Sequence, residues 1–160
     1  MTTSLAPIAL FVYNRPDHTQ RTLNFLRQNI LASESTLYIF SDGPKTHSDI
    51  ELVNEVRAII RKTTGFKTVY IQARNANCGL ANSIIMAVDS IVNEYGKVIV
   101  FEDDLISSAH TLQYFNDALQ RYQHEDRVMH IGAYMYPIDT KHLPETFFYR
   151  AATSWGWATW

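Results

Sequence analysis

Three consecutive acidic residues, Glu102, Asp103 and Asp104, directly follow a short, mostly β-branched run. Adjacent carboxylates repel one another, and the packing of a strand does not require them. A divalent cation would explain them, because Mg²⁺ and Mn²⁺ prefer oxygen ligands and commonly take one or two carboxylates together with substrate phosphates. The competing interpretation is that the acids cap the next helix or face solvent at a strand end. On position alone, the two interpretations are evenly matched.

Polar residues also follow three apolar runs earlier in the chain, in each case where the run ends. Arg15 and Arg74 carry guanidinium forks that fit phosphate oxygens, and the alternative for each is an ordinary surface arginine. Asp42 precedes Gly43-Pro44, so its alternative is a turn residue. The three groups are Asn14 and Arg15; Ser41 and Asp42; and Arg74, Asn75 and Asn77.

Aromatic residues gather at the end of the sequence, where Trp155, Gly156 and Trp157 precede Trp160. In an extended segment, Trp155 and Trp157 would point to the same face. Two aromatic rings on one face would form a platform for stacking a sugar ring. The alternative is that these tryptophans belong to the core or to a subunit contact.

The elements that must position these residues follow from the pattern of apolar side chains. Nearly continuous apolar runs predict strands covered on both faces. Between them, apolar residues at intervals of three and four predict helices. The expected strands are 8–13, 37–40, 67–71, 97–101, 128–133 and 146–149. The expected helical stripes are Leu23, Leu26 and Ile30; Ile50, Val53, Val56 and Ile60; Leu80, Ile84, Val88 and Ile91; and Leu112, Phe115, Leu119 and Tyr122.

Alternating strands and helices predict an α/β fold with a mostly parallel central sheet and helices on both faces. Pro16-Asp17 offers a start for the first helix, and Ser48 with Glu51 forms a possible capping box for the second. Ligands of such sheets bind beyond the carboxyl ends of the strands, so the polar groups are expected to meet at one edge. Together they would suit a ligand with a base, a ribose and phosphates, bound with a metal.

The composition is that of a globular domain, with 46% hydrophobic and 19% charged residues among 160. We therefore expect one domain over residues 1–160. The net charge of −2 excludes the basic surface that a nucleic-acid partner demands. The single cysteine, Cys78, excludes an internal disulfide and fits a reducing compartment.

The longest apolar run, residues 5–13, is far shorter than the roughly 20 residues of a membrane span, and it lacks the features of a signal peptide. A cytoplasmic protein is the expectation, with a peripheral position at the inner face of the membrane as a further possibility. The sequence stops at Trp160 without a turn or polar tail, so we expect a larger fold that is incomplete on this side.

Five segments, in order, resemble the GT-A superfamily of glycosyltransferases. The resemblance is strongest to the inverting family 2 branch, and the segments are also similar to the N-acetylglucosaminyltransferase I group. It covers nearly the whole chain, and the match of "VIVFEDDL" to a variant Asp-x-Asp motif favours the metal interpretation of the acids. The other four segments are "LFVYNRPDHTQRTLNFL", "FSDGPK", "NANCGLANSI" and "FFYRAATSWGWATW".

The resemblance implies a Rossmann-like GT-A fold that binds a nucleotide-diphosphate sugar, with UDP favoured, together with Mn²⁺ or Mg²⁺. It also implies the site residues. Asp104, supported by Asp103, would hold the metal, and Asp42 would read the base. The other implied donor-binding residues are Tyr13, Asn14, Arg15, Arg74, Glu102 and Asp103, and Trp155, Gly156 and Trp157 would shape the sugar and acceptor pocket.

The activity that this implies is transfer of the sugar to a hydroxyl of a glycan, lipid or protein acceptor, as in the synthesis of cell-surface polysaccharides. An inverting transfer needs a general base. In the resembling enzymes the base follows the Gly-Trp segment, so we expect it beyond residue 160 and assign none. Without it, the segment alone is expected to transfer poorly or not at all.

Three alternatives remain open. A non-catalytic nucleotide- or glycan-binding module would keep Asp42 and the acids but lack turnover. A sugar-phosphate nucleotidyltransferase would carry a glycine-rich loop after its first strand, where this chain has Asn14-Arg15-Pro16-Asp17. A receiver-type signalling domain would need acids after that same strand.

Overall fold

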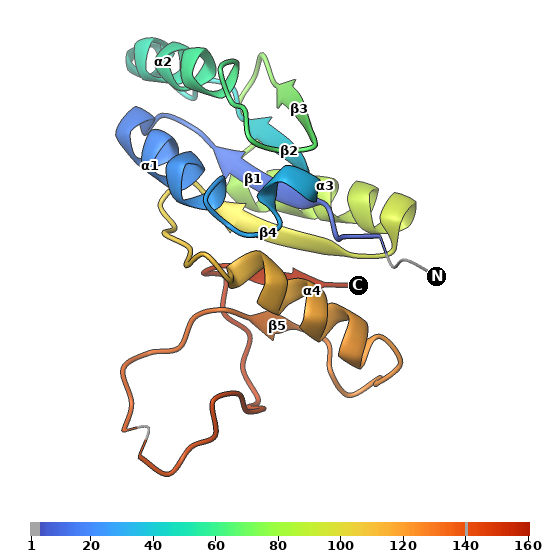
Figure 1. Cartoon of the computed structure of the whole chain (residues 1–160). Helices are drawn as coiled ribbons and strands as arrows, with labels where there is room; N and C mark the ends of the chain where they lie inside the picture. Colours follow the sequence, from blue (N-terminus) through green and yellow to red (C-terminus); the bar gives the residue numbers. More distant parts are fainter. Residues whose placement is uncertain (1–3, 140) are drawn as a thin grey trace.

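A six-stranded sheet forms the centre of the protein, as the computed structural model shows for residues 4–139 and 141–160 (Figure 1). The strand order is β3-β2-β1-β4-β6-β5. Strands β1 to β4 are parallel, and β6 runs antiparallel to both of its neighbours. The strands are β1 (Ile8–Val12), β2 (Thr36–Ser41), β3 (Thr68–Ala73), β4 (Val98–Glu102), β5 (Ile131–Gly132) and β6 (Trp157–Thr159).

Helices cover both faces of this sheet, which confirms the predicted α/β class. Side chains of β1 alternate between two hydrophobic clusters, with Leu10 in one and Phe11 in the other. The first cluster includes residues of α1 (Pro16–Leu26), α2 (Ile50–Ile60) and α4 (Thr111–Tyr122). The second includes residues of α3 (Leu80–Tyr95), which lies behind the sheet in Figure 1. Burial on both faces explains why β1 and β4 read as continuous apolar runs.

The first two helices differ from the predicted pattern at their ends. Helix α1 begins with Pro16 at its first position and ends at Leu26. Ile30, which was expected on its buried stripe, lies beyond that end and is 55% exposed. The capping box also lies elsewhere: Thr46 and Asp49 form it at the short 3₁₀ helix η2 (His47–Asp49), in place of Ser48 and Glu51. A second 3₁₀ helix, η1, spans Ala32–Glu34.

The expected stripe of α3 is confirmed at Ile91, which is buried, and at Ile84 and Val88, which pack partly buried against the second cluster. Ser83, Ala87 and Ile91 face the sheet, whereas Leu80 is 52% exposed at the start of the helix. Among the residues that the structure describes, no helix has the length and apolar character to cross a membrane.

The last part of the chain departs most from the prediction. The strand expected over 128–133 shortens to β5, and no strand forms over 146–149, where Phe148 is 68% exposed. Strand β6 instead inserts between β4 and β5, with Val100 opposite Trp157. Residues 133–139 and 141–156 form a long loop that extends away from the sheet (Figure 1). The apolar residues at 146–149 therefore have no strand to pair with.

Candidate functional site

A cavity of about 350 Å³ opens at the carboxyl ends of β1, β2 and β4, beside the start of α3. Parallel pairing aligns these ends, because Val12 lies opposite Ser41 and Phe11 lies opposite Glu102. The cavity is lined by residues that follow all three strands, as expected for an α/β sheet. Six predicted donor-binding residues line it: Tyr13, Asn14, Arg15, Asp42, Glu102 and Asp103.

One arginine bridges two of the three acids. Arg15 Nη1 donates to Asp104 Oδ2 at 3.0 Å, and Nη2 of the same guanidinium donates to Asp103 Oδ1. The Asp103 side chain is only 3% exposed, whereas the Asp104 and Arg15 side chains are 42% and 44% exposed. The Asp103 carboxylate is therefore shielded from water, whereas Asp104 is open to water and is not among the residues that line the cavity.

The acids that face the cavity sit in an environment that disfavours negative charge. Burial raises the pKa of the Glu102 carboxyl, and the nearby charges of Asp104 and Asp103 raise it further against the effect of Arg15. Burial also raises the pKa of the Asp103 carboxyl, although Arg15 and the backbone N–H of Tyr13 oppose the shift. Added positive charge beside these carboxyls would therefore be favourable.

Asp103 is also fixed through its backbone. The hydroxyl of Thr22, on α1, donates to the carbonyl oxygen of Asp103 at 2.8 Å in a buried setting. The backbone N–H of Tyr13 donates to Asp103 Oδ2 at 3.4 Å. These contacts attach the acidic turn after β4 to both β1 and α1, so the acids keep a defined position.

Asp42 holds the opposite wall of the cavity together. Its Oδ1 accepts the backbone N–H of Gly43 at 2.9 Å and that of Cys78 at 3.1 Å. Its Oδ2 accepts the Gly79 N–H at 2.9 Å and shares the Cys78 N–H at 3.2 Å. The carboxylate is 8% exposed and has about four lone-pair sites, so these amides occupy nearly all of its accepting capacity.

Further bonds lock the loop after β2 to the loop after β3. Asn77 Nδ2 donates to the carbonyl of Gly43 at 2.9 Å. A Cβ added to Gly43 would lie 2.5 Å from the carbonyl carbon of Ala76, so the two backbones touch. Arg57 on α2 donates to Ser41 Oγ and to the Asp42 carbonyl, each at 3.3 Å, and also to the carbonyl of Arg74.

Arg74 is placed differently from the other predicted donor-binding residues. It is not among the residues that line the cavity. Its guanidinium contacts the Cys78 sulfur and donates to Ser83 Oγ at 3.3 Å. Ser83 does line the cavity, so Arg74 reaches the site only through the residues that it supports.

The loop after β1 is preorganised by bonds to the segment after β2. Asn14 Nδ2 donates to Asp49 Oδ1 at 2.9 Å, and the hydroxyl of Tyr13 accepts the backbone N–H of Lys45 at 2.9 Å. Hydrogen bonds from the Thr46 hydroxyl, from Asn14 and from the Thr46 backbone lower the pKa of Asp49 to about 2. Asp49 is therefore a charged acceptor that fixes Asn14 at neutral pH.

The two tryptophans of the aromatic segment do not share a face. Gly156 has a φ of +75°, which turns the chain between them. Trp155 packs against Tyr134 with ring centroids 4.5 Å apart, whereas Trp157 stacks on His130 at 5.4 Å. Trp155, Gly156 and Trp157 do not line the cavity at the ends of β1, β2 and β4. A Cβ added to Gly156 would lie 3.8 Å from Cδ1 of Leu105, the residue that follows Asp104 in the sequence.

The donor set fits a divalent cation only in part. Among residues 4–139 and 141–160, no group of three or more His, Cys, Asp and Glu side chains converges as a metal site. Two carboxylates, those of Asp103 and Asp104, already share one positive group, the guanidinium of Arg15. Because Mg²⁺ and Mn²⁺ sites often combine one or two carboxylates with phosphate oxygens and water, these two acids fit a cation that arrives with a phosphate ligand.

The cavity also contains residues that the sequence reasoning did not assign. Lys45 adds a second cation, and it comes directly after the predicted turn residues Asp42, Gly43 and Pro44. Phe11 and Phe40 line the cavity from neighbouring strands, and their rings are stacked with centroids 5.2 Å apart. Of these three residues, only Lys45 could have been found from the local sequence, through its place beside the predicted turn. The stacking of Phe11 on Phe40 depends on the pairing of β1 with β2, which the local sequence does not show. The remaining unassigned lining residues are Val12, Gly79, Leu80 and Ser83, while Asn77 was expected at this edge as one of the polar residues after the third strand.

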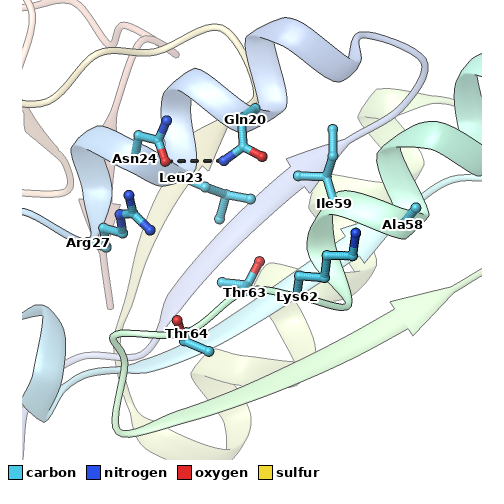
Figure 2. Close-up of a pocket in the computed structure, with 9 residues that line it drawn as sticks. All are labelled: Gln20, Leu23, Asn24, Arg27, Ala58, Ile59, Lys62, Thr63 and Thr64. Atoms are coloured by element: carbon cyan, nitrogen blue, oxygen red, sulfur yellow. Dashed lines mark hydrogen bonds between the residues drawn. The ribbon is translucent and has the colours of Figure 1, made fainter.

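A second pocket, of about 170 Å³, lies between α1 and α2 (Figure 2). Figure 2 shows Arg27 and Lys62 at its rim and the hydrogen bond from Gln20 to Asn24, which measures 3.1 Å. Its lining contains no carboxylate and none of the predicted site residues. Of these two pockets, the one at the strand ends is therefore the one that gathers the predicted site residues.

Comparisons with known proteins support this fold. Neither a protein-family model nor a curated protein sequence matches the chain. A mannosyltransferase from Pyrobaculum calidifontis, solved with GDP-Man and Mn²⁺, superposes with a TM-score of 0.53 at 11% identity, over 78% of this chain and 34% of that one. Residues 1–349 of S. aureus TarS superpose with a TM-score of 0.55 at 13% identity, over 74% and 33%. The chain thus spans about a third of the length of these structures and shares their GT-A-like fold.

Proposed function

We propose that this chain is the donor-binding part of a metal-dependent, inverting glycosyltransferase of the family 2 type. It would bind a nucleotide-diphosphate sugar, with UDP as the favoured nucleotide, and the acceptor would be a hydroxyl of a glycan, lipid or protein. The observation that carries the proposal is the cavity where Arg15, Asp42, Glu102 and Asp103 meet at the ends of three parallel strands, with Asp104 paired to Arg15 beside it. The mannosyltransferase solved with GDP-Man and Mn²⁺ adds support for a nucleotide-sugar and a divalent cation.

The proposed chemistry depends on stabilising a leaving nucleoside diphosphate. A divalent cation held by Asp104 and Asp103 would neutralise charge on the diphosphate as the glycosidic bond breaks. Arg15 and Lys45, which both line the cavity, would bind the remaining phosphate oxygens. Fixed cations in a partly dry cavity stabilise such charge better than water does, because they need no reorganisation during the reaction.

The remaining residues would position the donor. Tyr13 and Asn14, fixed by Lys45 and Asp49, would line the nucleotide. Asp42 would shape the base pocket through the loop that it holds. Trp155, Gly156 and Trp157 would contribute to the acceptor side, next to the acidic turn. The general base stays unassigned.

Calorimetric titration of UDP and GDP, with and without Mn²⁺, tests the proposal. We expect Mn²⁺-dependent binding that the Asp104→Asn variant loses. Asp89→Asn is the matched control, because it makes the same substitution at an exposed position of α3. Failure of the folded wild-type chain to bind any nucleoside diphosphate in the presence of Mn²⁺ would refute the donor site.

Turnover separates the transferase from a non-catalytic binding module. A panel of UDP- and GDP-linked sugars can be incubated with the protein, and release of free nucleoside diphosphate measured. Release that depends on Mn²⁺ and Asp104 supports a transferase. Tight binding without release from a longer chain that extends past residue 160 would favour the binding module.

A further inference from the structure

The guanidinium of Arg15 occupies the place on the acids where the proposed site needs a cation. It pairs with Asp104 at 3.0 Å and with Asp103 through its second amino group, so both of its terminal nitrogens are used. In this arrangement the Nη1 and Nη2 edge of the guanidinium faces the carboxylates, and a diphosphate could reach only the N–H groups that those two bonds leave over. A bidentate grip of that edge on a diphosphate therefore requires Arg15 to change partners.

The two ion pairs differ in how easily they can be exchanged. The Asp103 side chain is 3% exposed and also accepts the backbone N–H of Tyr13, so removing its countercharge would leave a buried carboxylate unpaired. The Asp104 side chain is 42% exposed, and Arg15 is its one ion-pair partner among the residues that the structure describes. Exchange is therefore easiest at Asp104.

The charges explain why a metal or a nucleotide alone would bind poorly. The acids Glu102, Asp103 and Asp104 outnumber the two cations Arg15 and Lys45, so a diphosphate arriving alone would meet a net negative site. A divalent cation arriving alone would have to displace Arg15 from Asp104, and the freed guanidinium would gain no new partner. When both arrive, the cation takes Asp104 and the guanidinium gains phosphate oxygens.

We propose that Arg15 is a built-in substitute for the metal, and that divalent cation and nucleoside diphosphate bind cooperatively through exchange of Arg15 from Asp104 to the phosphate. This inference rests on the proposed function, since it names how the same site loads. In this proposal Arg15 is a positioning residue: it opposes the binding of the cation alone, because it occupies Asp104, and it favours the binding of the diphosphate once it is released. By linkage, the factor by which UDP tightens Mn²⁺ binding equals the factor by which Mn²⁺ tightens UDP binding.

The test measures Mn²⁺ binding by the paramagnetic resonance signal of free Mn²⁺, with and without UDP or GDP. Wild-type protein should bind Mn²⁺ weakly by itself. Arg15→Gln should bind Mn²⁺ alone about tenfold more tightly and should lose most of the coupling to the nucleotide. Arg21→Gln, an exposed arginine on α1, is the matched control and should behave as wild type.

Arg15→Lys is the second variant, because Arg15→Gln leaves the buried Asp103 unpaired and can unfold. Lysine keeps the charge but cannot bridge two carboxylates with a planar fork, so intermediate Mn²⁺ affinity is expected. Folding of both variants is checked by circular dichroism. Unchanged Mn²⁺ affinity in folded Arg15 variants, while wild type still binds UDP with Mn²⁺, would overturn the exchange and leave the proposed function standing. Loss of all nucleotide binding by wild type would instead remove the proposed function.

Discussion

The carboxylate of Asp42 accepts the backbone N–H of Gly79 at 2.9 Å, across 37 residues of sequence. With the bonds from Gly43 and Cys78, this contact joins the end of β2 to the start of α3. The wall of the proposed nucleotide cavity is thus built around one buried acid, whose partners are three backbone amides and the thiol of Cys78 at 3.5 Å.

Replacing this acid should therefore loosen the whole wall. In Asp42→Asn, an NH₂ group would face amide donors that now meet a carboxylate oxygen, and we expect a loss of about 1–3 kcal/mol in the free energy of unfolding. Urea denaturation measures this loss, and Asp89→Asn should stay within about 0.5 kcal/mol of wild type. Full stability combined with an altered preference between UDP and GDP would show that Asp42 contacts the base and does not support the loop.

Gly43 should tolerate no side chain. Its added Cβ would lie 2.5–2.8 Å from three backbone atoms of Ala76, and backbone cannot move aside cheaply. We expect Gly43→Ala to cost more than about 2 kcal/mol and to weaken nucleotide binding.

Gly96→Ala is the comparison for that substitution. Gly96 has a φ of +76° with no atom within 4 Å of its added Cβ, so only conformational strain of about 1 kcal/mol is expected. Thermal melts of the two variants rank the two costs, and a smaller effect at Gly43 would contradict the close contact between the loops.

Two threonines on α1 should respond oppositely to the same substitution. Thr22→Val removes the donor to the carbonyl of Asp103 and leaves that buried oxygen unpaired, at a cost of about 1–3 kcal/mol. Thr19 is fully buried with no hydrogen-bond partner for its hydroxyl, so Thr19→Val should be neutral or stabilising. Chemical denaturation of both variants tests the pair, and equal destabilisation would argue that the Thr22 bond has no special role.

Asp49 should make stability depend on pH in the acidic range. Its folded-state pKa is lowered to about 2 from a usual value of 3.8, so its contribution is complete above the usual value and disappears as pH falls toward 2. Asp49→Asn should lower the melting temperature slightly at pH 7. Because the carboxylate is exposed, the effect should be small and reduced by salt.

Melting curves of Asp49→Asn and wild type from pH 7 to pH 2 provide the measurement. The two curves should converge as the wild-type carboxylate becomes protonated. A gap that stays constant over this range would show that Asp49 acts through packing and not through its charge.

Much of the fold was readable in the sequence because local patterns determine it. Four parallel strands and four helices were predicted close to their observed bounds, since burial on both faces produces apolar runs and helical packing produces stripes. Ile30 was misplaced because the helical spacing continues past Leu26, where the chain in fact turns. Strand β6 was missed because its pairing with β4, between Val98 and Thr159, joins residues far apart in the sequence.

The candidate site shows the same division. The acids and Arg15 were visible as unusual residues at strand ends, and their convergence followed from the parallel sheet. The pairing of Arg15 with both aspartates was not predictable, because each residue by itself suggests a ligand contact. Arg57 gave no signal either, since an arginine in a helix is ordinary until its partners after β2 and β3 are known.

Strand β1 lies between β2 and β4, so the cavity combines residues near position 13 with residues near position 103. Forming it requires closing a loop of 90 residues, and pairings of such long range are slow to form during folding. While the protein is being synthesised, the β1–β2–β3 unit leaves the ribosome with one edge of β1 unpaired until β4 follows. Competence to bind nucleotide should therefore emerge late in folding, after β4 has joined the sheet.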